Sequence, residues 1–144
     1  ARADPTWGLK RAARVRRREF ETVGTEMADM VSHRAGPNGT ATRELFVEMA
    51  RDNGGEMMAA QSDALARRLD MGSRLSEISC PSLMLWGRED KFSPAPDGLK
   101  MSTQIPNGRY VEISGCGHFP SLDAPEETVE ILLHWLQDAR LISD

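Results

Sequence analysis

Two residues in the second half of the chain have the side chains of an acid–base pair. Asp90 follows a short apolar run that ends at Gly87, and His118 follows Gly115 and Gly117, which permit a tight approach that bulky residues would obstruct. A carboxylate that accepts the Nδ1 proton of an imidazole holds the ring in one tautomer and stabilises the imidazolium that forms later. If the two side chains meet, they predict general-base catalysis in which the imidazole activates a nucleophile.

The elements around these residues read as strand, helix, strand. Residues 81–87 are almost continuously apolar, which is typical of a strand covered on both faces. Residues 95–104 indicate a helix, and residues 109–113 a second strand. One helix between two strands of the same sheet implies parallel pairing. Because the loops after parallel strands lie at one edge, where open α/β sheets place their ligand sites, we expect Asp90 and His118 to share a crevice.

A last helix is predicted from Asp123 onward. Asp123 could cap its free amides, with Glu126 reaching back as in a capping box. The apolar residues that follow recur at helical spacing, so we expect one face of this helix to be buried. That inner stripe consists of Val129, Leu132, Leu133 and Leu136, widened by Ile131 and Trp135.

Residues 1–74 have a helical pattern throughout, without the alternation of a strand. Apolar residues spaced by threes and fours predict a first helix that reaches Val31, with a kink at Gly24. A second helix is expected over residues 41–52 and a third over residues 56–69, separated by a pair of glycines.

In the order and spacing of its motifs, the second half of the chain closely resembles the C-terminal part of the α/β-hydrolase superfamily. Residues 78–90 look like the family's strand that ends in Gly-x-x-Asp, and residues 115–120 and 123–126 look like its Gly-His and Pro-Glu signatures. The resemblance implies an α/β fold in which Asp90 is the acid of a catalytic triad and His118 its general base.

The same resemblance divides the chain into two parts. It implies that residues 1–74 form a helical cap inserted before the strand. Residues 75–144 would then be the C-terminal α/β portion of the hydrolase core, with parallel strands and flanking helices. Caps differ greatly between members of the superfamily, so residues 1–74 match only in character and position.

The nucleophile of the triad has no counterpart in this pattern. The family's nucleophile elbow, Gly-x-Ser-x-Gly or a relative with Asp or Cys at its centre, has no match in the 144 residues. Without it the acid and base have nothing to activate, and Ser, Asp and Cys all stay open as its identity. We expect a missing N-terminal half or a second chain to complete the sheet, and the strand edge at residues 83–86 to be exposed or paired between molecules.

The leading hypothesis for function is a hydrolase of esters, lactones or similar small acyl substrates, which needs no cofactor. Trp86 and Phe119 flank the acid and the base and are candidate substrate contacts. The alternative is a catalytically inactive fragment, or a binding and assembly module that uses its helical region. A metal site with Cys116 and His118 is disfavoured, because one Cys-x-His pair lacks the repeated ligand pattern of zinc sites.

Composition and charge restrict the setting. No stretch approaches the roughly 20 apolar residues of a membrane span or the apolar core of a signal peptide, so we expect a cytoplasmic protein without membrane contact. Its two cysteines should be reduced thiols. Basic residues are concentrated at residues 10–18, although the net charge is −4. A solvated helix face is the preferred interpretation of this run, because no nucleic-acid motif accompanies it; binding to nucleic acid or another anionic surface is the alternative.

Overall fold

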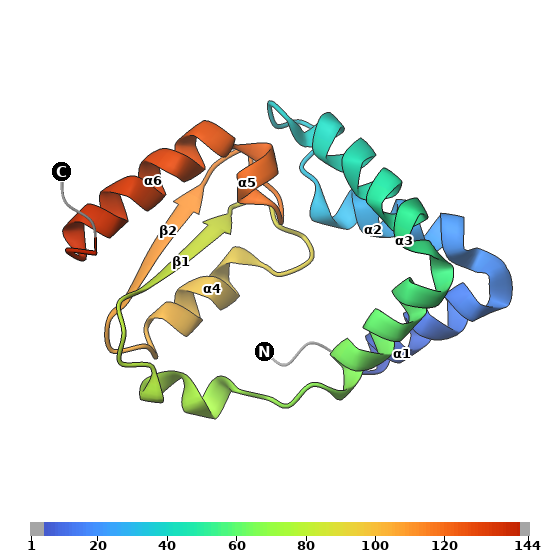
Figure 1. Cartoon of the computed structure of the whole chain (residues 1–144), viewed down its shortest axis with the longest axis horizontal. Coiled ribbons are helices and arrows are strands. Elements are labelled where there is room, and N and C mark those ends of the chain that lie inside the picture. Colours follow the sequence, from blue (N-terminus) through green and yellow to red (C-terminus); the bar gives the residue numbers. More distant parts are fainter. Residues whose placement is uncertain (1–4, 142–144) are drawn as a thin grey trace.

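A short parallel sheet lies between two helices in the computed structural model, which describes residues 5–141. β1 (Ser82–Gly87) and β2 (Gly108–Ile113) pair in parallel, and α4 (Ala95–Ser102) connects them. Figure 1 shows α4 on one side of the two strands and α6 (Pro125–Asp138) on the other. The predicted succession of strand, helix, strand and helix is therefore confirmed, as is the parallel pairing.

Both outer edges of the two-stranded sheet are unpaired among the described residues. Among the described residues, β2 is the only strand that pairs with β1, so the other edge of β1 is free. The side chains of residues 83–86 are half-buried rather than enclosed. The edge is therefore open within the described residues, and its expected pairing with a missing half or a second chain stays a prediction.

The apolar stripe predicted for α6 is wrong in part. Val129 is 53% exposed, Leu132 39% and Leu133 49%, whereas Thr128 is buried and Leu136 is half-buried. The periodicity marks an apolar face correctly, but nothing within residues 5–141 covers most of it. The outer edge of β1 and this helix face are thus both left uncovered by the described residues.

The first half of the described chain is helical, as predicted. α1 (Pro5–Arg14), α2 (Phe20–Val31) and α3 (Gly39–Arg67) pack together, and a π-helical turn, η1 (Val15–Glu19), joins the first two. A 3-10 turn, η2 (Gly72–Glu77), leads to β1, and the proposed division of the chain after residue 74 falls within it. The buried cluster between the helices consists of Ala12, Val15, Val23 and Ala59, with Phe20, Met27 and Met58 packed against it.

The first predicted helix breaks at a different residue from the one expected. The backbone leaves the helical conformation at Arg17 and Arg18, the second of which has a φ of 69°, so the kink expected at Gly24 is wrong. Gly24 lies inside α2, where packing on α3 overrides its weak helix propensity. The predicted break in α3 is found at Gly54, with a φ of 77° and a ψ of 166°.

The two glycines give a paired prediction for stability. Gly54→Ala should destabilise the chain by about 1–3 kcal/mol, because this backbone conformation is open almost only to glycine. No atom lies within 4 Å of the added methyl group, so strain alone is measured. Gly24→Ala should instead stabilise by about 1 kcal/mol, since its methyl group would meet Ala50 and Met58 at an ordinary 3.9 Å. Urea unfolding of both variants measures the difference, and equal stabilities would contradict it.

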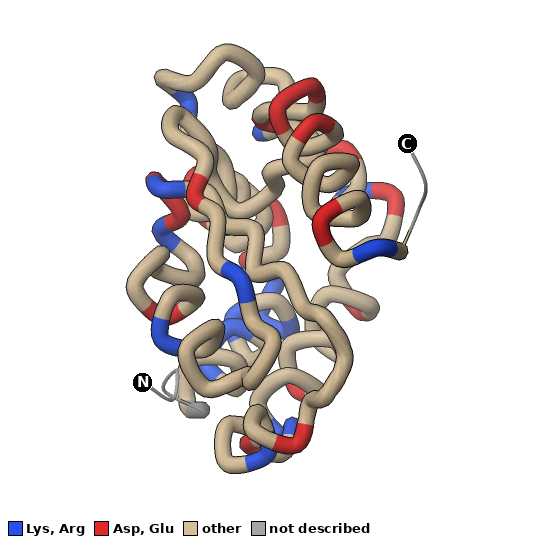
Figure 2. Tube along the Cα trace, turned by 90° about the vertical axis from the view of Figure 1, so that its left-hand side faces the viewer, with Lys and Arg blue, Asp and Glu red and all other residues tan. Residues whose placement is uncertain are grey.

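The basic run of residues 10–18 is divided between solvent and intramolecular partners. Arg14 pairs with Glu26 at 2.6 Å and also with Glu19, and Arg16 pairs with Asp63. Figure 2 shows Lys and Arg interspersed with Asp and Glu along the trace. Arg11 departs from the predicted solvated face, because it is 8% exposed and its Nε donates to Ser62.

No helix within residues 5–141 combines the length and the apolar character needed to cross a membrane.

Candidate active site

The structure brings Asp90 and His118 together. The Nδ1 atom of His118 lies 2.7 Å from Oδ2 of Asp90. The carboxylate follows β1 and the imidazole follows β2, so parallel pairing delivers both to the same edge of the sheet. The Asp90 side chain is 3% exposed and that of His118 is 32% exposed, which leaves the carboxylate shielded from water and the ring accessible.

The second carboxylate oxygen of Asp90 fixes its orientation. Oδ1 accepts the main-chain N–H groups of Phe92 at 2.8 Å and Ser93 at 2.9 Å. Oδ2 is thereby directed at the imidazole, and an ionised carboxylate there places the proton on Nδ1. Nε2 of His118 has no hydrogen-bond partner within residues 5–141 and can accept a proton from an incoming group.

Aromatic rings surround the imidazole. Phe92 and Phe119 contact it edge to face, with ring centroids 4.9 Å and 5.2 Å away. Trp7 of α1 packs on Phe92 at 5.5 Å, and Phe46 of α3 lies 6.1 Å from Phe119. The helical first half of the chain therefore reaches the site from two helices. Phe119 could be predicted here from the sequence, but Phe92 was not predicted. Its position two residues after Asp90 is the feature that could have identified it.

Trp86 packs away from this aromatic group. Its ring lies against Gly98 of α4, where a β-carbon would overlap it, and its indole N–H donates to the carbonyl of Ser93 at 2.7 Å. Among the described ring contacts, none joins Trp86 to His118. Its role as a substrate contact stays a prediction, as does that of Phe119.

Glycines allow the histidine loop to approach its neighbours closely. Gly115 has a φ of 72°, which favours glycine. A β-carbon on Gly117 would lie 2.7 Å from the carbonyl oxygen of Val31, at the end of α2. A β-carbon on Gly87 would overlap the carbonyl oxygens of both Cys116 and Gly117. The expected tight approach is therefore found on both sides of the loop.

Cys116 does not have the properties of a nucleophile. Its side chain is fully buried, and burial, with a smaller contribution from Asp123, raises the pKa of the thiol to about 12. The thiolate needed for attack or for metal binding is therefore absent at neutral pH. Within residues 5–141, no group of three or more His, Cys, Asp or Glu side chains could hold a metal ion. Cys80 and Cys116 are both unpaired.

Asp123 does not cap the last helix, so the predicted capping box is wrong. It ends a separate short helix, α5 (Pro120–Asp123), and α6 begins at Pro125 without a side-chain cap. The Asp123 side chain is buried and Oδ2 accepts the main-chain N–H of Gly117 at 2.6 Å. The spacing of Asp123 and Glu126 indicated the start of a helix. In the structure the Asp123 carboxylate instead accepts a hydrogen bond from the loop that carries His118.

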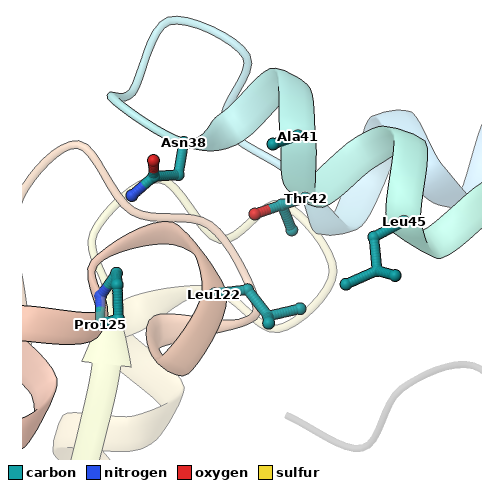
Figure 3. A pocket seen from close by; sticks show the side chains of 6 residues that line it. All are labelled: Asn38, Ala41, Thr42, Leu45, Leu122 and Pro125. Carbon is teal, nitrogen blue, oxygen red and sulfur yellow. The ribbon is translucent and has the colours of Figure 1, made fainter.

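A hollow of about 230 Å³ lies where α3 meets α5 and the start of α6 (Figure 3). Its lining is mainly apolar, and one polar group in it, the hydroxyl of Thr42, is buried without a partner among the described residues. The lining residues are Asn38, Ala41, Thr42, Leu45, Leu122 and Pro125.

Comparison with known families agrees with this architecture. The family model described as "alpha/beta hydrolase fold" matches residues 12–125, most of the chain. The chain belongs to the α/β-hydrolase family. This membership confirms the family and the α/β fold class that the sequence motifs indicated. Relatives of the chain are themselves named as hydrolases or esterases.

Two curated relatives of this α/β-hydrolase chain have nearly the same enzyme name. A 2-hydroxy-6-oxononadienedioate/2-hydroxy-6-oxononatrienedioate hydrolase of Pseudomonas putida is 40% identical over 68 residues, which are 47% of this chain and 24% of the relative. A hydrolase of the same name from Cupriavidus pinatubonensis is 46% identical over 50 residues, 35% of this chain and 17% of the relative.

Solved structures of α/β-hydrolases superpose on almost the whole chain. A thermophilic esterase from Thermogutta terrifontis has a TM-score of 0.83 at 28% identity, covering 95% of this chain and 52% of the esterase. MenH from S. aureus has a TM-score of 0.78 at 19% identity, covering 96% of this chain and 55% of MenH, which shows the shared fold. The chain spans about half the length of these solved relatives, and its matches span about a quarter or less of the curated ones.

Proposed function

We propose that this chain supplies the acid and the base of a hydrolase that attacks a carbonyl carbon. The observation that carries the proposal is the 2.7 Å contact between Nδ1 of His118 and Oδ2 of Asp90. The nucleophile would lie on a segment outside these 144 residues, either in the same polypeptide or in a second one. We refer to this chain together with that segment as the complete hydrolase.

In the proposed reaction, Nε2 of His118 takes the proton of the nucleophile as it attacks the substrate carbonyl, and later returns it to the leaving group. Asp90 keeps the other ring nitrogen protonated and stabilises the imidazolium between these steps. The buried carboxylate is held by two main-chain N–H groups, so little reorganisation is needed when the charge develops. Amides on the nucleophile's segment would stabilise the oxyanion.

Esters, lactones and similar small acyl compounds are the substrate class we favour. Support comes from the esterase of Thermogutta terrifontis, which superposes on 95% of this chain. The aromatic rings of Phe92 and Phe119 beside the imidazole fit a small substrate with apolar parts.

A second candidate is hydrolysis of a carbon–carbon bond next to a ketone. It is favoured by the 40% identity to the hydrolase of Pseudomonas putida, whose name gives an oxo-dienedioate as substrate. Such a compound has no ester to cleave, so water must be added across a carbon–carbon bond. The same acid and base could serve this reaction, because the attacked atom is again a carbonyl carbon.

Parallel assays of the complete hydrolase separate these candidates. p-Nitrophenyl acetate and butyrate report ester hydrolysis, and 2-hydroxy-6-oxononadienedioate, with products separated by chromatography, reports carbon–carbon cleavage. We expect the esters to be turned over faster. Turnover of the dienedioate alone would favour the second candidate, and turnover of neither would reject the proposal.

The 144-residue chain alone should be inactive in the same assays, because the nucleophile elbow of the family has no match in its sequence. We propose that the missing segment extends the sheet at the open edge of β1. The same segment would cover the exposed apolar stripe on α6. Ester turnover by the isolated chain that vanished in His118→Ala would contradict the assignment of the nucleophile to another segment.

A further inference from the structure

The loop that carries His118 is held through three consecutive main-chain N–H groups. Cys116 donates to Oε2 of Glu89 at 3.0 Å, Gly117 to Oδ2 of Asp123 at 2.6 Å, and His118 to the carbonyl of Val31 at 2.8 Å. The three acceptors come from the turn after β1, from α5 and from the end of α2. Three separate parts of the fold therefore determine where the imidazole is placed.

We propose that Asp123 is a positioning residue for His118, an inference that rests on the proposed function. Asp123 is 1% exposed. Its main chain is anchored at both ends: the N–H donates to the carbonyl of Phe119 at 2.8 Å, and the carbonyl accepts Nδ2 of Asn38 at 3.1 Å. Figure 3 shows Asn38 beside Leu122 and Pro125, which are near Asp123 in the sequence.

The carboxylate of Asp123 is unusual, because it is buried and has no basic partner in the part of the chain that the structure describes. Oδ2 accepts only the Gly117 N–H, and Oδ1 has no hydrogen-bond partner among residues 5–141. Burial of an incompletely paired carboxylate costs free energy. The 2.6 Å distance between the main-chain nitrogen of Gly117 and Oδ2 is short for an N–H···O hydrogen bond. This bond restrains the loop at the residue before His118.

This restraint acts on the residue next to the base. Gly117 is clamped, because a β-carbon there would lie 2.7 Å from the Val31 carbonyl oxygen and 3.1 Å from Oδ2 of Asp123. Without the carboxylate the loop can move away from α5. Because His118 directly follows Gly117, this movement also displaces the imidazole. A shift of about 1 Å in a catalytic group can cost on the order of 100-fold in rate.

Kinetics of the complete hydrolase test the inference. Asp123→Ala should lower kcat by about 10- to 100-fold with KM changed less than about twofold, because the residue acts on the base and not on substrate. Asp123→Asn keeps an acceptor for Gly117 and should restore kcat to within about threefold of the parent. Ser121→Ala, an exposed position on the same short helix, is the matched control and should change neither constant.

Nuclear magnetic resonance of the 144-residue chain gives a second readout that does not need the nucleophile. In Asp123→Ala the Gly117 amide should exchange faster with solvent, and the low-field signal of the Nδ1 proton of His118 should weaken or vanish. Both should persist in Asp123→Asn and Ser121→Ala. If Asp123→Ala cannot be purified, Asp123→Ser, whose side chain is one bond shorter, replaces it with the same expected results.

The outcomes separate this inference from the proposed function. An Asp123→Ala variant with parental kcat and an unchanged Nδ1 proton signal would overturn the positioning role, as would an Asp123→Asn variant that is folded but as impaired as Asp123→Ala. Loss of turnover in His118→Ala together with either result would reject only the role of Asp123. Turnover that survived in His118→Ala would reject the proposed function itself.

Discussion

Replacing His118 by alanine should lower kcat of the complete hydrolase by on the order of 10⁶-fold, with little change in KM. The proposed base takes a proton during attack and returns it to the leaving group, so its loss removes both transfers. The side chain is partly exposed and its main-chain N–H to Val31 remains in the variant. Folding should therefore be preserved, and the loss should appear in steady-state kinetics with an ester substrate.

His134→Ala is the control for this result. His134 lies on α6 with its side chain 68% exposed and is 3.5 Å from Asp138, so its removal should leave kcat unchanged. Circular dichroism of both variants shows whether the fold is retained. A His118→Ala enzyme with near-normal turnover would show that the Asp90–His118 pair is not the catalytic base and its orienting acid.

Asp90→Asn should lower kcat by about 10⁴-fold, the scale of loss when the acid of a Ser-His-Asp triad becomes an amide. Main-chain N–H groups of Phe92 and Ser93 donate to Oδ1 at 2.8 Å and 2.9 Å, so the amide oxygen should keep that position. Its NH₂ group then faces Nδ1 of His118 and donates to it. The ring is driven to the tautomer protonated on Nε2, which cannot accept a proton from the nucleophile.

The contrast with a surface carboxylate tests this explanation. Asp138 forms an exposed ion pair with Arg109, and Asp138→Asn should leave kcat unchanged. The position of the histidine proton can be read from ¹⁵N chemical shifts of the imidazole in the 144-residue chain. Finding the proton still on Nδ1 in Asp90→Asn, together with parental kcat, would contradict an orienting role for the carboxylate.

The meeting of Asp90 and His118 could be predicted because chain order determines it. One helix between two strands of a sheet requires parallel pairing, and parallel pairing places the two following loops at one edge. The aromatic surroundings could not be predicted in the same way. Trp7 and Phe46 reach the site from helices far away in sequence, and no local pattern specifies how α1 and α3 pack on the second half of the chain.

Local patterns also failed where a tertiary contact competes with them. Asp123 followed three residues later by Glu126 has the spacing of a capping box, but its carboxylate is used by Gly117. Gly24 has weak helix propensity, yet the helix breaks instead at Arg18, a residue with no such signal. Short-range rules predicted the type of each element better than the role of the side chains at its ends.

The bond from the His118 amide to the carbonyl of Val31 joins the two halves of the chain through main-chain atoms alone. Such a bond makes no demand on which side chain stands at position 31. The helical region can therefore change in sequence at this position and still hold the loop that carries His118. Among related proteins we would expect the path of the backbone here to persist longer than the identities of its residues.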